Sequence, residues 1–189
     1  MTGRLELDEG EAVGARVEGA RHSGESFVDA RLVDVEFVRC DLSGCDFSEA
    51  SWLRVRLTDC RCTGIDLAQT SLKNVTFTDC KLDDANLRMA KLHEVRFENC
   101  VLVGADAINA TLEAVAFPGC DLAGMDFSQV RCADVDLRDA RLDGIKGVDA
   151  LRGSMIGVDQ LFGLAPAFAQ ALGITIATDA AASEAPDAR

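Results

Sequence analysis

The residues of this 189-residue chain that are best suited to chemistry are cysteine thiols, and their spacing argues against reactive roles. The eight cysteines are Cys40, Cys45, Cys60, Cys62, Cys80, Cys100, Cys120 and Cys132. There is no C-x-x-C pair, and the sequence Cys60-Arg61-Cys62 has no partner ligands at the spacing of a zinc site. Five of the cysteines recur every 20 residues, and we expect all eight to be reduced thiols that are buried as small hydrophobic side chains. We therefore expect neither a metal nor disulfides.

Catalytic signatures are also missing from the sequence. The only histidines are His22 and His93, and no G-x-S-x-G, Walker, dinucleotide-binding or H-E-x-x-H motif occurs. Carboxylates that are scattered outside a cleft cannot be placed in a dry site that tunes their pKa. We expect a protein that is not an enzyme and that uses no cofactor.

Carboxylates dominate the charge of the chain. The 32 Asp and Glu outnumber the 19 Lys and Arg, which gives a net charge of −13. Such a surface repels nucleic acid and suits a basic protein partner. No run approaches the ~20 apolar residues of a membrane span, and the first residues do not resemble a signal peptide. We expect a cytoplasmic protein that binds neither nucleic acid nor membrane.

An internal repeat determines where these residues lie. From Phe27 to Leu142, every fifth position, here called the centre, is usually Leu or Phe, and the residue two before it is usually small or β-branched. A second period of 20 residues aligns the cysteines, valines and glycines. Four pentapeptides per period predict a four-sided solenoid, with six full coils over residues 25–144 that stack at ~4.8 Å each.

The pentapeptides themselves carry a family resemblance. Residues 85–89 read Ala-Asn-Leu-Arg-Met, and residues 45–49 and 120–124 follow the same A(D/N)LXX pattern with Cys in place of Ala. This pattern resembles that of the pentapeptide repeat family. The resemblance implies an all-β fold, a right-handed quadrilateral parallel β-helix, here with a short C-terminal helical cap.

The repeat also sets the expected boundaries. We expect a frayed N-terminus over residues 1–14, the β-helix over 15–147, a cap and dimerisation module over 148–177, and a disordered tail over 178–189. His22 is expected to be a polar cap residue at the open end of the first coil. Glycines two residues past the centre predict corners with positive φ, with Asp84 at the same position.

The segment after residue 147 shows helix signals and an excess of apolar residues. Met155 and its neighbours predict a last strand, Asp159 an N-cap, Pro166 a break and Gly173 a stop. Two roles remain open for the apolar residues: a cap within the chain, or an interface with a second copy, which we favour. The residues expected at the dimer interface are Leu161, Phe162, Leu164, Phe168 and Leu172.

Charge is uneven among the four sides. The side centred on Phe27, extended to residues 145–149, carries eight acids against Arg88 and Lys146, whereas the next side carries four acids against five bases. An acidic stripe of this kind suits a basic partner, and the residues expected to bind it are Asp46, Glu49, Asp66, Asp106 and Asp126. An alternative explanation is that an Asp before the centre accepts hydrogen bonds from nearby turn amides.

A second resemblance concerns function. The acidic rod and the tail around residues 157–161 and 171–174 resemble the fluoroquinolone-resistance proteins of the Mfp and Qnr type. Those proteins are DNA-mimicking dimers, and the resemblance implies a homodimer that binds DNA gyrase or a related type II topoisomerase. The alternative is a structural or adaptor solenoid that binds another protein. The sequence does not identify the topoisomerase or a drug, or distinguish protection from inhibition.

Overall fold

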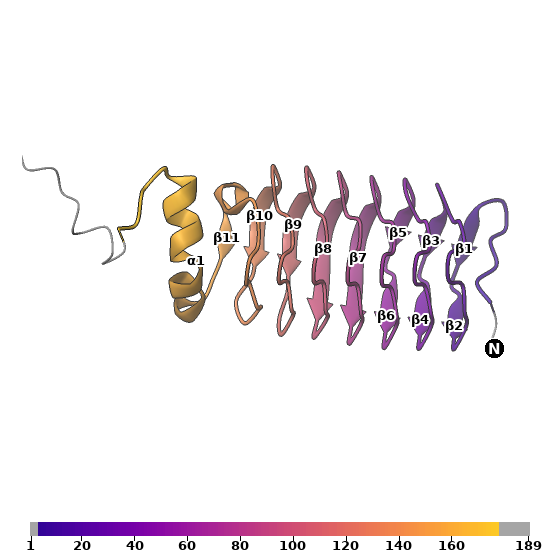
Figure 1. The fold of residues 1–189 in the computed structure, drawn as a ribbon. Helices are drawn as coiled ribbons and strands as arrows, with labels where there is room; N and C mark the ends of the chain where they lie inside the picture. Colours follow the sequence, from indigo (N-terminus) through magenta and orange to yellow (C-terminus); the bar gives the residue numbers. More distant parts are fainter. Residues whose placement is uncertain (1–3, 178–189) are drawn as a thin grey trace, which may run out of the picture.

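The computed structural model describes residues 4–177 as a rod of stacked coils that ends in a helix (Figure 1). The tail expected over residues 178–189 lies outside the described residues, as do residues 1–3. The strands are β1 (Glu11–Val13), β2 (Arg16–Glu18), β3 (Arg31–Val33), β4 (Glu36–Val38), β5 (Ser51–Leu53), β6 (Arg56–Thr58), β7 (Ser71–Thr78), β8 (Lys91–Glu98), β9 (Thr111–Ala116), β10 (Arg131–Asp136) and β11 (Ser154–Met155). They are followed by α1 (Val158–Ala171), and η1 (Val148–Ala150) precedes β11.

The 20-residue register predicted from the sequence is confirmed. All strand pairs from β1 to β10 are parallel and align residues 20 apart, as in Leu32 with Trp52 and Phe77 with Phe97. The two sides without strands keep the register through isolated bridges such as Asp41 with Arg61 and Arg61 with Lys81. Each pentapeptide is therefore one side of a quadrilateral coil, and like positions form columns along the rod.

The core consists of the centre residues and the small residues two before them. Phenylalanine rings stack between coils, with centroids of Phe77 and Phe97 4.7 Å apart and those of Phe97 and Phe117 5.1 Å apart. Leu57 interrupts this column, and the larger Trp52 on the adjacent side lies between the rings on either side, 6.5 Å from Phe37 and 6.3 Å from Phe77. A large residue in one column thus compensates for a small one in the next, which keeps the interior close-packed.

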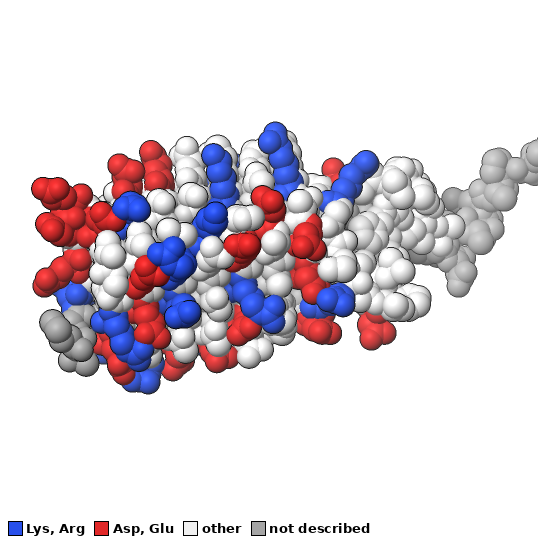
Figure 2. All heavy atoms as spheres, turned by 180° about the vertical axis from the view of Figure 1, so that it is seen from behind, with Lys and Arg blue, Asp and Glu red and all other residues white. Residues whose placement is uncertain are grey.

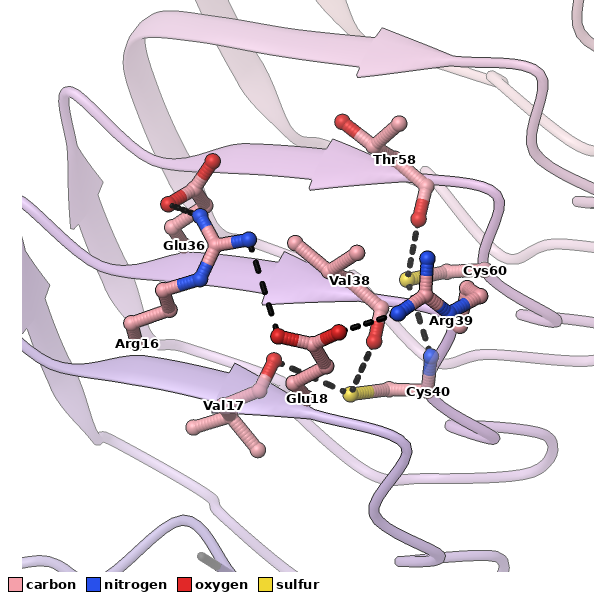
Figure 3. Close-up of polar contacts among 9 residues, drawn as sticks. All are labelled: Arg16, Val17, Glu18, Glu36, Val38, Arg39, Cys40, Thr58 and Cys60. Atoms are coloured by element: carbon pink, nitrogen blue, oxygen red, sulfur yellow. Dashed lines mark hydrogen bonds and ion pairs between the residues drawn. The ribbon is translucent and has the colours of Figure 1, made fainter. Parts of the chain in front are cut away.

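The cysteines are free thiols, and seven of the eight are buried. Figure 3 shows the Sγ of Cys40 directed at the carbonyl oxygens of Val17 and Val38, each 3.4 Å away. Burial raises the pKa of Cys45 to about 11. The expectation that all eight are buried is wrong for Cys132, which is partly exposed because β11 covers only the Val135–Asp136 end of β10.

Positive φ at the corners extends beyond the glycines. Gly44 and Gly104 have φ of 64° and 70°, as expected, and Asp84 has 55°. The same left-handed conformation occurs at corners that the sequence did not single out, for example at Glu49 and Met89. Every coil turns in this way, so residue type alone does not decide where the corners lie.

Paired structure at the N-terminal end begins at β1, inside residues 1–14, which we expected to be frayed. Asp8 and Glu11 exchange two backbone hydrogen bonds, which fold residues 5–8 back over the first coil. His22 is fully buried there: its Nε2 accepts a hydrogen bond from the backbone N–H of Leu5 at 3.0 Å, and its Nδ1 lies 3.1 Å from Glu25 Oε2. The imidazole thus occupies a capping position.

The C-terminal end departs from the 20-residue period. The short helix η1 precedes β11, which pairs with β10 in a register that is one residue shorter than the 20-residue period, with Val135 opposite Ser154. Gln160 then ties α1 to the last coil, because its Nε2 donates to the carbonyl oxygens of Leu137 and Ala140 at 2.7 and 2.5 Å.

Two expectations about α1 are wrong. Gly157, rather than Asp159, is the N-cap, and Asp159 lies in the first turn, where the helix dipole favours an acid. Pro166 lies inside an unbroken helix; its missing N–H leaves the carbonyl of Phe162 without a helical partner on an exposed turn, where water can solvate it. The stop at Gly173 is confirmed: its φ is 70°, and Ile174 N–H donates to Ala169 O at 2.8 Å, as in a Schellman motif. Among residues 4–177, no helix is long and apolar enough to cross a membrane.

Candidate functional site

The pentapeptides centred on Phe27, Phe47, Leu67, Leu87, Ala107 and Phe127 form one side of the rod, which we call the acidic face. Four of the five predicted partner-binding residues lie on it in a single column: Asp46 bridges to Asp66, Asp66 to Asn86, Asn86 to Asp106, and Asp106 to Asp126. All four carboxylates are half-buried. Parallel stacking therefore brings together residues that are up to 80 positions apart in the sequence.

Each aspartate of this column also has a structural role. One carboxylate oxygen accepts a hydrogen bond from the backbone N–H two residues later, at 2.9 Å from Ser48 to Asp46 and 2.8 Å from Ala68 to Asp66. Ile108 and Ser128 do the same for Asp106 and Asp126, both at 2.9 Å. The turn contacts considered from the sequence are present, so one oxygen of each carboxylate is engaged within the coil.

Several second contacts reduce the charge of the column. The guanidinium of Arg88 donates to Asp106 Oδ2 at 2.7 Å, and Lys146 Nζ lies 4.0 Å from Asp126 Oδ2. Burial alone would raise the pKa of Asp126, but the hydrogen bonds from Ser128 outweigh it and hold that pKa below its usual value. Asn86 Nδ2 donates to Asp66 Oδ1 at 3.0 Å. The sequence placed Arg88 and Lys146 on this side but did not show which acids they pair with.

Glu49 differs from the four aspartates. It lies in the neighbouring corner column and its side chain is exposed, with a backbone φ of 62°. Within residues 4–177 its carboxylate takes part in no side-chain hydrogen bond or ion pair. Of the five predicted partner-binding residues, Glu49 is therefore the one whose charge is fully available to a partner.

Elsewhere along the rod, acids and bases alternate and pair across coils. Arg54 donates two 2.6 Å hydrogen bonds to Asp34. Figure 3 shows two further pairs, Arg16 with Glu36 and Arg39 with Glu18. The face in Figure 2 shows such mixed charges over the body and a gathering of acids at the N-terminal end. A surface groove beside Arg54 and Arg56 is lined with both signs of charge, so it offers no uniform field to a charged ligand.

The five residues expected at a dimer interface separate into two groups. Leu164 is buried and Phe168 packs against the core, so both cover the end of the coil within the chain. Phe162 and Leu172 remain 76% and 75% exposed, and Leu161 47%. The surface over this end carries few charges (Figure 2). The helix thus caps the solenoid with one side and exposes apolar side chains on the other.

Comparisons with known proteins agree with this architecture. The chain matches the family model described as pentapeptide repeat region over residues 30–107 and 70–147. It is similar to a solved structure of a trypsin-treated variant of QnrB1, a plasmid-mediated fluoroquinolone resistance protein, with 18% identity, coverage of 89% of this chain and 99% of that chain, and a TM-score of 0.57.

A second similar structure is HetL, a pentapeptide repeat protein involved in heterocyst differentiation regulation from the cyanobacterium Nostoc, with 17% identity, coverage of 76% and 90%, and a TM-score of 0.36. No curated protein matches the sequence significantly. At these identities the likeness to QnrB1 concerns the fold.

Proposed function

This chain belongs to the pentapeptide repeat family, and we propose that it is a dimeric, cytoplasmic DNA mimic that binds a type II topoisomerase such as DNA gyrase through its acidic face. The observation that carries the proposal is the column of Asp46, Asp66, Asp106 and Asp126, with Glu49 beside it. A rigid rod with negative charge along one side resembles duplex DNA in shape and in sign of charge, so it can bind to a basic DNA-binding surface.

The spacing of these charges limits the mimicry. Successive coils repeat at ~4.8 Å along the rod, whereas one DNA strand carries a phosphate per ~3.4 Å of helix axis, and Asn86 leaves one position of the column uncharged. The likeness therefore rests on shape, width and sign of charge rather than on a phosphate-by-phosphate match. We expect binding that weakens as the salt concentration rises, because attraction between surface charges of opposite sign is screened by salt.

A homodimer is part of this proposal. The exposed apolar side chains Leu161, Phe162 and Leu172 on and after α1 would be covered by the same surface of a second copy, in a two-fold arrangement. Two rods joined end to end would double the length of the acidic face. Leu164 and Phe168 would support this interface from below, by fixing α1 on the last coil.

The proposal is tested by a gyrase supercoiling assay with added protein at low salt. Inhibition at micromolar protein is expected, and it should weaken when Asp66 and Asp106 are both changed to Asn, which removes two charges and keeps the turn acceptors. A matched control is Glu94→Gln with Asp134→Asn, which also removes two negative charges but from another side. Absence of inhibition by the wild type would contradict the proposal.

A second candidate function is an adaptor solenoid that binds a different protein. It is favoured by the turn hydrogen bonds of the four aspartates, which give these residues a reason to be present without any partner. A pull-down that recovers a partner other than a topoisomerase, with binding that survives the Asp66→Asn and Asp106→Asn changes, would support this candidate.

A further inference from the structure

Met89 occupies a position on the acidic face that suits it poorly on two counts. Its backbone has a φ of 57°, in the left-handed region, and its side chain is 50% exposed. A large unbranched side chain in that conformation costs free energy that Gly, Asn or Asp largely avoids. Exposure of an apolar side chain gives no compensating burial. Within this chain alone, Met89 therefore has no evident stabilising role.

The equivalent corners on the same side are polar. The residues of this column with positive φ are Asp29, Glu49, Gln69, Met89, Asn109 and Gln129. Among all non-glycine residues of positive φ between residues 4 and 177, only Met89 and Ala114 have apolar side chains, and Ala114 lies on another corner. Met89 is thus the larger of the two apolar residues with positive φ, and it is exposed.

Met89 has an apolar residue near it on the adjacent coil, while the positions on either side of it in its own column are the polar Gln69 and Asn109. Its backbone N–H donates to the carbonyl of Ile108 at 3.0 Å, so the partly exposed Ile108 lies on the adjacent coil. Arg88 is held by its hydrogen bond to Asp106. Along the aspartate column, the same coil has Asn86 in place of an acid, with Asp66 on one side and Asp106 on the other.

We propose that Met89, with Ile108 beside it, is the apolar anchor through which the acidic face is recognised, and that the partner is a basic protein surface with an apolar pocket between its positive groups. Charge complementarity supports this partner, because Asp66 and Asp106 lie in the neighbouring column on the coils before and after that of Met89, and Asp66 has no ion pair within residues 4–177. Binding energy at interfaces concentrates in central apolar anchors that are surrounded by polar contacts, and methionine adapts well to such pockets. This inference rests on the proposed function, since it takes the topoisomerase as the partner.

The strain at Met89 provides the test. Asn tolerates positive φ, so Met89→Asn should raise the Tm by about 1–3 °C while it weakens binding to purified DNA gyrase holoenzyme by about tenfold. If Met89 had only a structural role, Met89→Asn would lower both the Tm and the affinity for gyrase. The matched control is Ala114→Asn, which relieves the same backbone strain on another corner and should raise the Tm without any change in gyrase binding.

A footprint on the wild-type protein gives an independent readout. Hydrogen peroxide transfers one oxygen atom to an accessible thioether and leaves as water, and Met89 and Met155 are 50% and 46% exposed whereas Met125 is buried. With gyrase bound, sulfoxide formation at Met89 should fall at least fivefold and that at Met155 should not change.

The outcomes separate the two proposals. If the wild type binds gyrase but Met89→Asn binds equally well and Met89 stays open to peroxide in the complex, the anchor is wrong and the proposed function stands. If the wild type does not bind gyrase at all, both are wrong. Weaker binding by Met89→Asn with an unchanged or higher Tm, together with protection of Met89, supports the anchor.

Discussion

Asp46 and Asp66 are partners in a parallel bridge, so two carboxylates are held one coil apart, and the Oδ1 atom of each accepts a backbone hydrogen bond, at 2.9 and 2.8 Å respectively. The arrangement combines two effects of opposite sign. The turn hydrogen bonds stabilise each corner, whereas repulsion between like charges on adjacent coils destabilises the stack. Substitutions that separate charge from hydrogen-bonding capacity can therefore distinguish structure from function at the same position.

The first prediction concerns stability at Asp66. Asp66→Asn keeps an oxygen that accepts from Ala68 N–H, as Asn86 does for Arg88 in the next coil, and it should change the free energy of unfolding by less than about 0.5 kcal/mol. Asp66→Ala removes the acceptor and should cost about 1 kcal/mol. Urea denaturation of the two variants measures the difference, and equal stabilities would show that the turn hydrogen bond contributes nothing.

Acid should destabilise the coil through carboxylates of this kind. A hydrogen bond from the Ser43 hydroxyl to Asp41 Oδ1, at 2.7 Å, holds the pKa of Asp41 below its usual value. A pKa that is lower in the folded state gives stability that is fully present above the unfolded pKa of about 4 and is lost as the pH falls below it. The Tm should be nearly constant from about pH 7 to 5 and fall below about 4. The Tm of Asp41→Asn should fall less steeply below pH 4 than that of the wild type. If the two proteins have the same dependence of Tm on pH, Asp41 does not contribute to the acid sensitivity.

The most reactive thiol should be that of Cys132, because the last coil is only partly covered at the C-terminal end. Cys132 is the partly exposed cysteine, whereas the other seven are buried. In native protein, an aromatic disulfide reagent should modify about one thiol quickly, and Cys132→Ser should abolish that fast phase. Burial raises the pKa of Cys132, so even this thiol should react more slowly than a free thiol in solution. Rapid modification of several thiols would mean that the coils open readily.

The sequence predicted the coil well because its repeat is local. Each five-residue unit reports directly which residue is buried, and the 20-residue period reports which residues stack, as Leu32 on Trp52 shows. Cys132 and α1 were predicted less well, because they lie where the repeat ends. Covering the last coil depends on long-range contacts, such as Gln160 with Leu137 O, and no periodic pattern encodes them.

The candidate site was predictable in part. The column of acids follows from the register, but the contacts of Asp106 and Asp126 with Arg88 and Lys146 depend on side-chain conformations. Met89 reads as an ordinary repeat residue in the sequence. Its unusual position emerges only when its positive φ and its exposure are known together.

The proposed dimer predicts a change in mass for one surface substitution. Phe162 is 76% exposed and makes no part of the core, so Phe162→Glu should leave the Tm of the coil nearly unchanged and convert a dimer into a monomer. Light scattering after size-exclusion chromatography measures the mass. Arg152→Glu, outside α1, is the control and should remain dimeric. A wild type that is already monomeric at micromolar concentration would contradict the interface.

The central claim is that the acidic face takes the place of DNA on a topoisomerase, and competition tests it most directly. Purified gyrase bound to labelled linear duplex DNA is titrated with this protein at fixed low salt. We predict that the protein displaces the DNA, that more DNA raises the required protein concentration in proportion, and that the Asp66→Asn, Asp106→Asn variant displaces it less well. Binding of the protein and the DNA to the enzyme at the same time, without mutual displacement, would contradict the account.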